Sequence, residues 1–266
     1  MLEATVNYLA ETAEKPYFYL YEPPAGAAWR NTTGDRRMLS IRDARELDPA
    51  PTLDREGFDL ARIETRVEDL YDPAVVREVY YREVERLVRD VTGAGRVVAF
   101  DHNVRSGVEA ERRENGAQPP VRFPHNDYTL RSGPQRVRDL FPAGEAETLL
   151  RHRFAVVNVW KPIRGVVEEA PLAVCDARTI AERDFVETDL RYRDRLGEIY
   201  SLRFNPAHRW FYYPRMRASE AMLLKCYDSD ATRARFTAHT AVDDPATPAD
   251  AAPRESIEVR TLAFFG

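Results

Sequence analysis

Apolar residues recur at helical spacing in one stretch of the chain and at every second position in many others. The helical stretch begins at Asp72 and Pro73, which are typical of an N-cap and a first helical residue. Apolar side chains then recur at every third or fourth position up to Gly93, and they are Val75, Val76, Val79, Tyr80, Val84, Leu87, Val88 and Val91. This pattern predicts one long amphipathic helix.

Strand-like segments dominate the rest of the chain. Before the helix, residues 16–70 alternate short apolar clusters with Pro, Asn and Asp, which is typical of short strands and covering loops. Two further helical segments are expected at residues 134–141 and 145–152. Many short strands with few helices predict a mainly β protein, a barrel or a sandwich with supporting helices. The candidate strands after the long helix are residues 96–104, 121–130, 153–163, 171–175, 197–204, 209–213, 220–227, 236–242 and 255–265.

No Ser/Gly linker and no internal repeat divides the chain, which predicts one domain over residues 1–266. Within it we expect residues 1–95 to form an N-terminal extension with strands and the long helix, and residues 96–266 to form the β-core. Gly93 and Gly95 precede a candidate strand, which is the reverse of the glycine-rich turn in dinucleotide-binding folds. This order argues against a nucleotide or S-adenosylmethionine pocket.

Composition and charge narrow the class of protein further. The 39 basic and 44 acidic residues are well mixed and leave a net charge of −5, so the basic patch of a nucleic-acid-binding protein is missing. No apolar run approaches the roughly 20 residues of a membrane-spanning helix, and the N terminus has no secretory-signal pattern. Cys175 and Cys226 lie in apolar stretches without metal or redox spacing, as reduced buried thiols do. We therefore expect a cytoplasmic protein without membrane or nucleic-acid partners, whose oligomeric state stays open.

Candidate chemistry begins with His125 and Asp127, which lie two residues apart on a predicted strand. Side chains at alternate positions of a strand share one face, so this pair can bind a single ion. His239 lies on a later predicted strand and could supply the second imidazole of a mononuclear iron site. Two imidazoles and one carboxylate would leave positions open for substrate and oxygen.

The last predicted strand places Arg254, Ser256, Glu258 and Arg260 on one face and apolar residues on the other. Taken alone, this alternation is typical of a strand with a solvated polar face. Beside the three candidate ligands, a second interpretation is favoured. A guanidinium and a hydroxyl can hold the distal carboxylate of a dicarboxylate co-substrate whose other end binds the metal.

In this order the motifs resemble those of the Fe(II)/2-oxoglutarate-dependent oxygenases. More specifically, the chain resembles the family that groups fungal gibberellin A4 desaturase with the cephamycin 7α-hydroxylation/methoxylation component. The resemblance runs from about residue 5 to the C terminus. The segments that carry it are residues 158–163, 171–176, 208–214, 225–229 and 253–260.

The resemblance implies a double-stranded β-helix, which is also called a jelly roll and is cupin-like. It implies a dioxygenase that uses Fe(II), 2-oxoglutarate and O2 to hydroxylate or desaturate an unactivated C–H bond of a small molecule, in secondary metabolism, with release of succinate and CO2. His125, Asp127 and His239 would be the iron ligands and the catalytic group. Arg254 with Ser256 would anchor 2-oxoglutarate, and Arg260 is the alternative anchor because it shares the face of Arg254. The substrate and the choice between hydroxylation and desaturation stay open.

Further residues near the predicted ligands are candidates for the substrate pocket, and each also has an ordinary structural interpretation. Aromatic residues on strands usually belong to a core, and a histidine in a barrel wall is usually hydrogen-bonded there. Two rival functions are a jelly-roll protein with a structural metal and a methyltransferase or accessory subunit of a methoxylation system. The candidate pocket residues are Tyr128, Asn158, Trp160, His208 and Tyr212.

Overall fold

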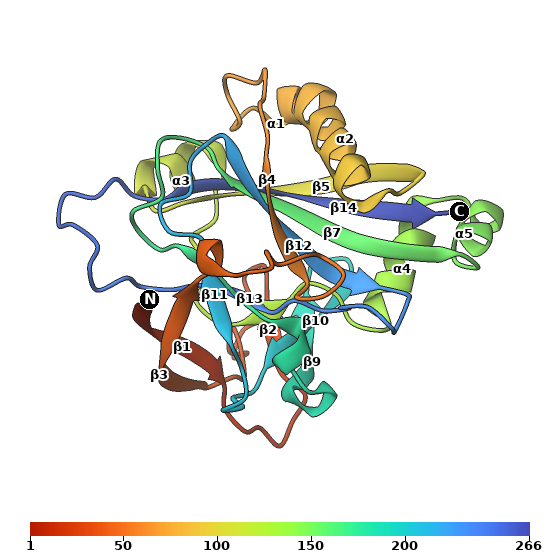
Figure 1. The fold of residues 1–266 in the computed structure, drawn as a ribbon. Coiled ribbons are helices and arrows are strands. Elements are labelled where there is room, and N and C mark those ends of the chain that lie inside the picture. Colours follow the sequence, from red (N-terminus) through yellow and green to blue (C-terminus); the bar gives the residue numbers. More distant parts are fainter.

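Two β-sheets form the body of the protein in the computed structural model, which describes residues 1–266 (Figure 1). The larger sheet has nine strands in the order β1-β3-β11-β8-β13-β6-β10-β9-β2. Its strands are Leu2–Leu9 (β1), Tyr17–Tyr19 (β2), Gly34–Asp43 (β3), His125–Asn126 (β6), Leu172–Cys175 (β8), Phe185–Arg191 (β9), Leu196–Leu202 (β10), Trp210–Tyr212 (β11) and His239–Ala241 (β13). The prediction of a mainly β protein is confirmed.

The smaller sheet has five strands in the order β4-β12-β7-β14-β5. Its neighbours pair in antiparallel register, and β7 lies at its centre between β12 and β14. The strands are Phe58–Arg62 (β4), Arg96–Ser106 (β5), Arg153–Pro162 (β7), Glu220–Asp228 (β12) and Glu255–Phe265 (β14).

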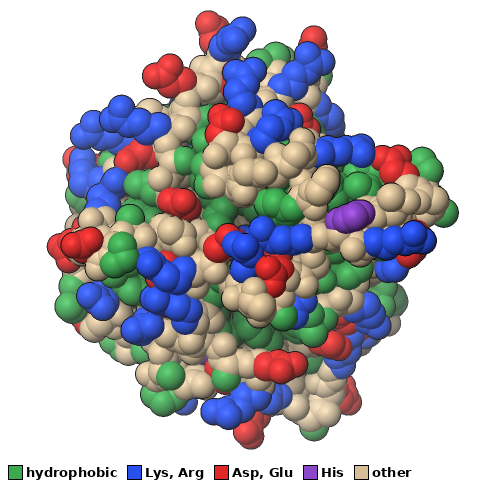
Figure 2. All heavy atoms as spheres, turned by 45° about the vertical axis from the view of Figure 1, so that its right-hand side comes forward, with side chains coloured by type: hydrophobic (Ala, Val, Ile, Leu, Met, Phe, Trp, Pro, Cys, Tyr) green, Lys and Arg blue, Asp and Glu red, His purple; other side chains and the backbone are tan.

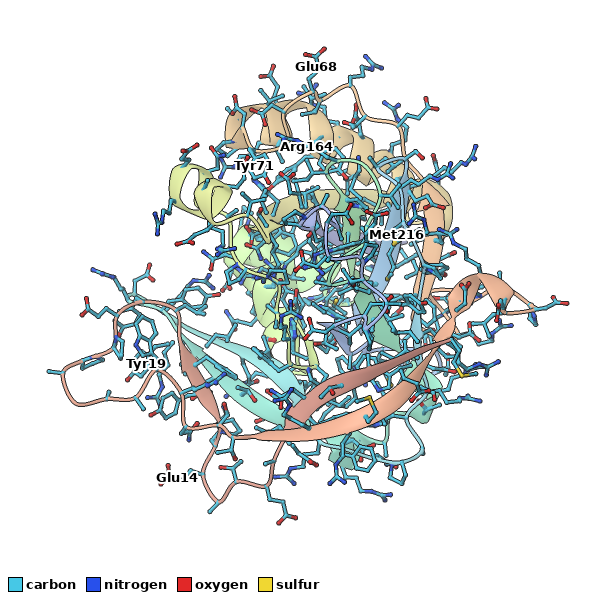
Figure 3. All side chains as sticks on the ribbon, turned by 90° about the vertical axis from the view of Figure 1, so that its left-hand side faces the viewer. Glu14, Tyr19, Glu68, Tyr71, Arg164 and Met216 are labelled. Atoms are coloured by element: carbon cyan, nitrogen blue, oxygen red, sulfur yellow. The ribbon has the colours of Figure 1, made fainter.

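The predicted long helix covers the outer face of the smaller sheet (Figure 1). The side chain of Asp72 accepts hydrogen bonds from the first turn, and the helix proceeds through Pro73–Val75 (α1), a π-helical turn at Val76–Tyr80 and Tyr81–Thr92 (α2). It ends at Gly93, whose φ of +71° is a left-handed conformation that glycine adopts without strain. Val84 and Val88 are fully buried in a cluster with Val159 and Val259 of the sheet. Figure 3 shows the helix above the sheets and the long strands β1 and β3 on the opposite side of the molecule.

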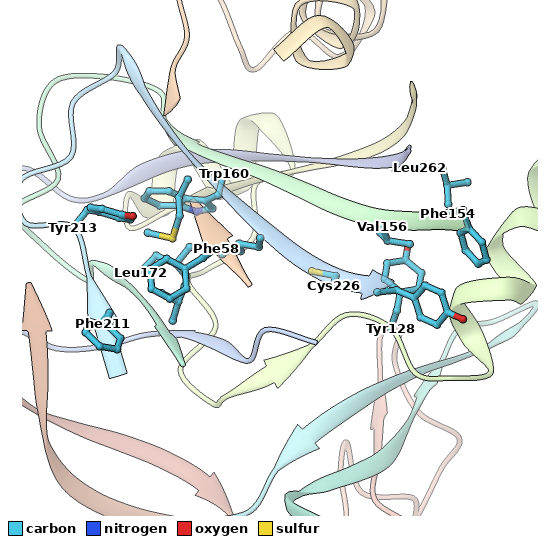
Figure 4. Close-up of a cluster of buried hydrophobic side chains, with 14 of the residues drawn as sticks. Phe58, Tyr128, Phe154, Val156, Trp160, Leu172, Phe211, Tyr213, Cys226 and Leu262 are labelled. Carbon is cyan, nitrogen blue, oxygen red and sulfur yellow. The ribbon is translucent and has the colours of Figure 1, made fainter. Parts of the chain in front are cut away.

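Apolar side chains fill the space between the two sheets (Figure 4). Phe58 and Trp160 come from the smaller sheet and Leu172 and Phe211 from the larger one. A separate cluster, built around Tyr8, Trp210 and Leu202, packs against the other face of the larger sheet. The alternation along β11 explains this division, since Phe211 belongs to the first cluster and Trp210 and Tyr212 belong to the second.

Some elements differ from the sequence prediction. Of residues 121–130, only His125–Asn126 pairs as a strand, and residues 236–242 are reduced to His239–Ala241. Strands β1 and β9 and the helix Glu109–Asn115 (α3) were not predicted. The two expected helical segments are Ser132–Leu140 (α4) and Ala143–Leu149 (α5).

The first 95 residues are more than a cover for the β-core. They contribute β1, β2 and β3 to the larger sheet and β4 to the smaller one.

Cys175 and Cys226 are free and buried, as expected. None of the helices is long and apolar enough to cross a bilayer. Figure 2 shows basic and acidic side chains interspersed over one face of the molecule, in keeping with the mixed charge of the sequence.

Candidate metal centre

Two neighbouring strands bring the predicted histidines together. His125 on β6 pairs directly with His239 on β13, and their ring centroids lie 4.6 Å apart. The Nδ1 atom of His125 lies 3.0 Å from the carbonyl oxygen of Phe123, and that of His239 lies 3.0 Å from the carbonyl oxygen of Thr237. Because a carbonyl can only accept, each Nδ1 carries the proton and donates it. Each Nε2 therefore keeps a lone pair for a metal.

Asp127 completes the group directly after β6. One ligand atom from each of His125, Asp127 and His239 can be chosen so that all three lie within 4.8 Å of one another. The Oδ2 atom of Asp127 accepts hydrogen bonds from Asn158 Nδ2 and Arg260 Nε, both at 2.8 Å. The other carboxylate oxygen, Oδ1, lies 3.5 Å from His125 Nε2. Two imidazoles and one carboxylate form the donor set of a facial triad with open positions.

The electrostatics of the triad suit a divalent cation. Burial, and then the neighbouring His239, lower the pKa of His125 to about 3, so its imidazole is neutral. Burial alone would raise the pKa of Asp127, but the Arg260 guanidinium holds it well below its usual range. Neutral imidazoles and an ionised carboxylate are the protonation states in which these side chains bind metals.

The two candidate anchor arginines have different surroundings. Arg254 is buried, donates through Nη1 to the carbonyl of Ala170, and lies with its guanidinium carbon 5.5 Å from the centre of the Trp160 ring. Its Nε atom and the Oγ atom of Ser256 are both buried without a hydrogen-bond partner. Arg260 is already engaged, since it donates to Asp127 and to Asp101. The open hydrogen-bonding capacity at Arg254 and Ser256 fits the carboxylate of a ligand.

The candidate pocket residues divide into two groups. Asn158 holds Asp127, and Trp160 lies against Arg254. Tyr128 is buried in the cluster between the sheets, close to Val156 and Cys226 (Figure 4). The structure does not bring the other two candidates, His208 and Tyr212, to the triad.

His208 and Tyr212 belong to the other face of the larger sheet. Tyr212 packs in the cluster around Trp210, which is separate from the one between the sheets. His208 contacts Asp184 through Nε2 at 3.1 Å and the Tyr8 hydroxyl through Nδ1 at 3.2 Å. His208 is therefore a hydrogen-bonded histidine of the wall, which is the structural interpretation that the sequence also allowed.

Arg105 is a residue near the site that sequence reasoning missed. It lies on β5 directly opposite Ser256, makes no ion pair, and donates through Nη1 to the carbonyl of Pro119 at 2.9 Å. A second guanidinium therefore lies beside the unpartnered groups of Arg254 and Ser256. The signal was the alternation of Asp101, Asn103 and Arg105, whose polar side chains recur at every second position of a predicted strand.

Comparisons with known proteins agree with this fold and site. A family model described as an oxidoreductase/YMDC permease-like domain matches residues 6–264. The Fe(II)/2-oxoglutarate-dependent dioxygenase nvfI of Aspergillus novofumigatus (strain IBT 16806) is 34% identical over 97% of this chain and 93% of that protein. The hydroxylase/desaturase CTB9 of Cercospora beticola is 31% identical over 96% of this chain and 89% of that protein. A solved structure of the iron and alpha-ketoglutarate-dependent endoperoxidase NvfI superposes with a TM-score of 0.89 at 32% identity, covering 99% of this chain and 97% of that one.

Identity above 30% over nearly the whole of both chains shows the family. The chain belongs to the Fe(II)/2-oxoglutarate-dependent dioxygenases and hydroxylase/desaturases that include these relatives, and its fold is their jelly roll. The protein is thus an enzyme that depends on Fe(II), 2-oxoglutarate and O2, as the sequence motifs predict.

Proposed function

We propose that His125, Asp127 and His239 hold the Fe(II), and that Arg254 and Ser256 hold the distal carboxylate of 2-oxoglutarate. The enzyme would hydroxylate or desaturate an unactivated C–H bond of a small molecule of secondary metabolism. The observation that carries the anchor assignment is the pair of buried, unpartnered polar atoms, Arg254 Nε and Ser256 Oγ. Leaving such groups unpaired costs roughly 1–3 kcal/mol each, which a bound carboxylate would recover.

The surrounding residues have supporting roles in this proposal. Asn158 and Arg260 orient Asp127 by holding one of its oxygens, so that the other is free for the metal. Arg105 adds positive charge beside Ser256, which favours a co-substrate with two carboxylates. The bound iron and 2-oxoglutarate would supply the oxidation by O2, with succinate and CO2 as co-products. The two free, buried cysteines support a reducing compartment such as the cytoplasm.

The test is anaerobic reconstitution of the purified protein with Fe(II) and 2-oxoglutarate. The wild type is expected to show the weak visible metal-to-ligand absorption of such complexes, and His125→Ala and His239→Ala are expected to lose it. Arg254→Gln and Ser256→Ala should keep Fe(II) binding and weaken 2-oxoglutarate binding by about tenfold or more, because a hydrogen bond to a charged group is lost. His152→Ala is the matched control, since this histidine is exposed and lies outside the triad.

Two outcomes would contradict the proposal. A folded wild type that shows no such absorption would contradict the ligand assignment. Loss of 2-oxoglutarate binding in an Arg260 variant that still binds Fe(II), with Arg254→Gln unaffected, would move the anchor to Arg260. In the rival interpretation of a structural metal, chelation should lower the thermal midpoint strongly, whereas we expect only the modest shift of a bound ligand.

A further inference from the structure

A pocket lies apart from the triad, between the loops that follow Asp54, Ala177 and Asp230. Its volume of about 510 Å³ lies within the range of small-molecule sites. None of the three triad residues lines it, and neither does Arg254 or Ser256. Whatever binds there would contact neither the proposed metal ligands nor the proposed 2-oxoglutarate anchor.

Three aromatic side chains form an apolar floor of the pocket. Phe185, Tyr200 and Phe236 all line it and pack against one another, with ring centroids 5.0 to 5.5 Å apart. Leu130, which also lines the pocket, is 44% exposed. A flat apolar ligand would cover these side chains and gain the free energy of removing them from water.

Charge at the rim favours an anion. Four arginines and two carboxylates, those of Asp54 and Glu182, line the pocket, which leaves an excess of two positive charges. Arg55, Arg178 and Arg233 are each bound to carboxylates. The fourth, Arg235, donates through Nε to the carbonyl of Asp228 and stacks on Phe236 at 5.5 Å, but it forms no ion pair.

We propose that this pocket is a second binding site, and that its ligand is a small organic anion with a flat apolar body. Arg235 would bind the anionic group, and Phe185, Tyr200 and Phe236 would pack against the apolar body. Glu182 lines the same pocket without an ion-pair partner and would oppose the anion. The inference goes beyond the proposed oxygenase reaction, because binding here needs neither iron nor 2-oxoglutarate.

Calorimetric titration of the metal-free 266-residue chain with 2-naphthoate tests the proposal, and the neutral 2-naphthalenemethanol is the matched ligand. Naphthoate is expected to bind more tightly than the alcohol. Arg235→Gln should weaken naphthoate binding by about tenfold, the effect of losing a charged hydrogen bond, and leave the alcohol unchanged. Glu182→Gln should strengthen naphthoate binding, because a like charge is removed. Arg233→Gln is the control, since Asp54 and Asp230 already hold that arginine.

A second variant and a second readout locate the bound probe. Ala234→Phe should block the pocket without removing a polar side chain, and naphthoate should shift the methyl resonance of Ile180, which lines it.

No binding by the wild type would overturn the proposal, and so would equal affinities for the acid and the alcohol. Binding that is lost in Arg254→Gln and retained in Arg235→Gln would also overturn it, because the probe would then occupy the proposed co-substrate anchor. The Fe(II)/2-oxoglutarate absorption should persist in Ala234→Phe, so failure here and failure of the proposed function are distinguishable.

Discussion

Asp127 shows how one side chain can be set for metal binding by its neighbours. Its Oδ2 atom is held by both Asn158 and Arg260, while Oδ1 is the oxygen next to His125. The two hydrogen bonds restrict rotation of the carboxylate before any metal arrives. Removing one of them should therefore loosen the metal site without removing a ligand.

We expect Asn158→Ala to weaken Fe(II) binding by about tenfold, the lower end of the effect of removing such a supporting partner. Arg260 would still hold the carboxylate, so the triad should survive. Anaerobic competition with a coloured chelator measures the affinity, and urea unfolding of the metal-free variant separates a local effect from loss of the fold. An unchanged affinity would show that Arg260 alone suffices to orient Asp127.

His208 affects the pH dependence of the free energy of unfolding, because its role is structural. Burial lowers its pKa below 6.5, and the hydrogen bond to Asp184 offsets only part of this. The unfolded chain therefore binds more protons than the folded one just below pH 6.5, and the free energy of unfolding falls as the pH decreases through that region. We expect His208→Gln to lose less stability between pH 7.5 and 5.5 than the wild type does, as measured by urea unfolding at both pH values. The same loss in both proteins would assign the acid sensitivity to other groups.

At the scale of elements, the space around a glycine shows how closely its helix packs on the sheets. A Cβ atom added at Gly133 in α4 would lie 2.5 Å from Cδ2 of Tyr227, whereas one added at Gly144 in α5 would meet nothing within 4 Å. We expect Gly133→Ala to lower the free energy of unfolding by about 1–3 kcal/mol through overpacking. Gly144→Ala should raise it by about 0.5 kcal/mol through helix propensity. Urea unfolding of both variants checks the pair, and equal effects would contradict the close packing of α4 on Tyr227.

The elements also show what the sequence could and could not predict. The helix at Pro73–Val75 and Tyr81–Thr92 follows from local periodicity, because it buries one continuous face. The long strand β14 follows from the alternation of polar and apolar residues, although the structure buries both of its faces. Strand β6 does not, since Pro124 has no N–H for a ladder and Asn126 uses its side chain to bind the carbonyls of Tyr128 and Cys226. Such partners lie up to 100 residues away in the sequence and leave no local pattern.

Alternation along single strands predicts pairs of residues in the candidate site, whereas His239 was expected from the order of the motifs along the chain. The spacing of His125 and Asp127, and the shared face of Arg254 and Ser256, could be derived from the period of a strand. The position of Arg105 beside Ser256 depends on the pairing of β5 with β14, which the sequence of either strand alone does not determine. The sequence already favours Arg254 over Arg260 as the proposed anchor, and the hydrogen-bond partners of the two guanidinium groups support that proposal.

At the scale of the whole molecule, the N-terminal residues are part of both sheets. β1 and β3 form one end of the larger sheet, β4 forms one edge of the smaller sheet, and α2 covers the smaller sheet's outer face. Removing residues 1–95 would expose apolar residues of the smaller sheet, including Val159 and Val259, and would take β1 and β3 away from the larger sheet. We therefore propose that residues 1–266 fold as one cooperative unit and that the fragment 96–266 does not fold alone.

Three tryptophans allow this proposal to be tested in the 266-residue chain without mutation. Trp160 lies in the cluster between the sheets, Trp210 lies in the cluster on the other face of the larger sheet, and Trp29 is 57% exposed. Labelling with 5-fluorotryptophan gives each position a 19F resonance. We expect the native resonances of Trp160 and Trp210 to disappear at the same urea concentration, because the strands that separate the two clusters belong to one sheet. If Trp210 unfolded at a lower concentration than Trp160, the N-terminal strands and their cluster would form a separate, weaker unit, and the triad on β6 and β13 would not depend on them for its stability.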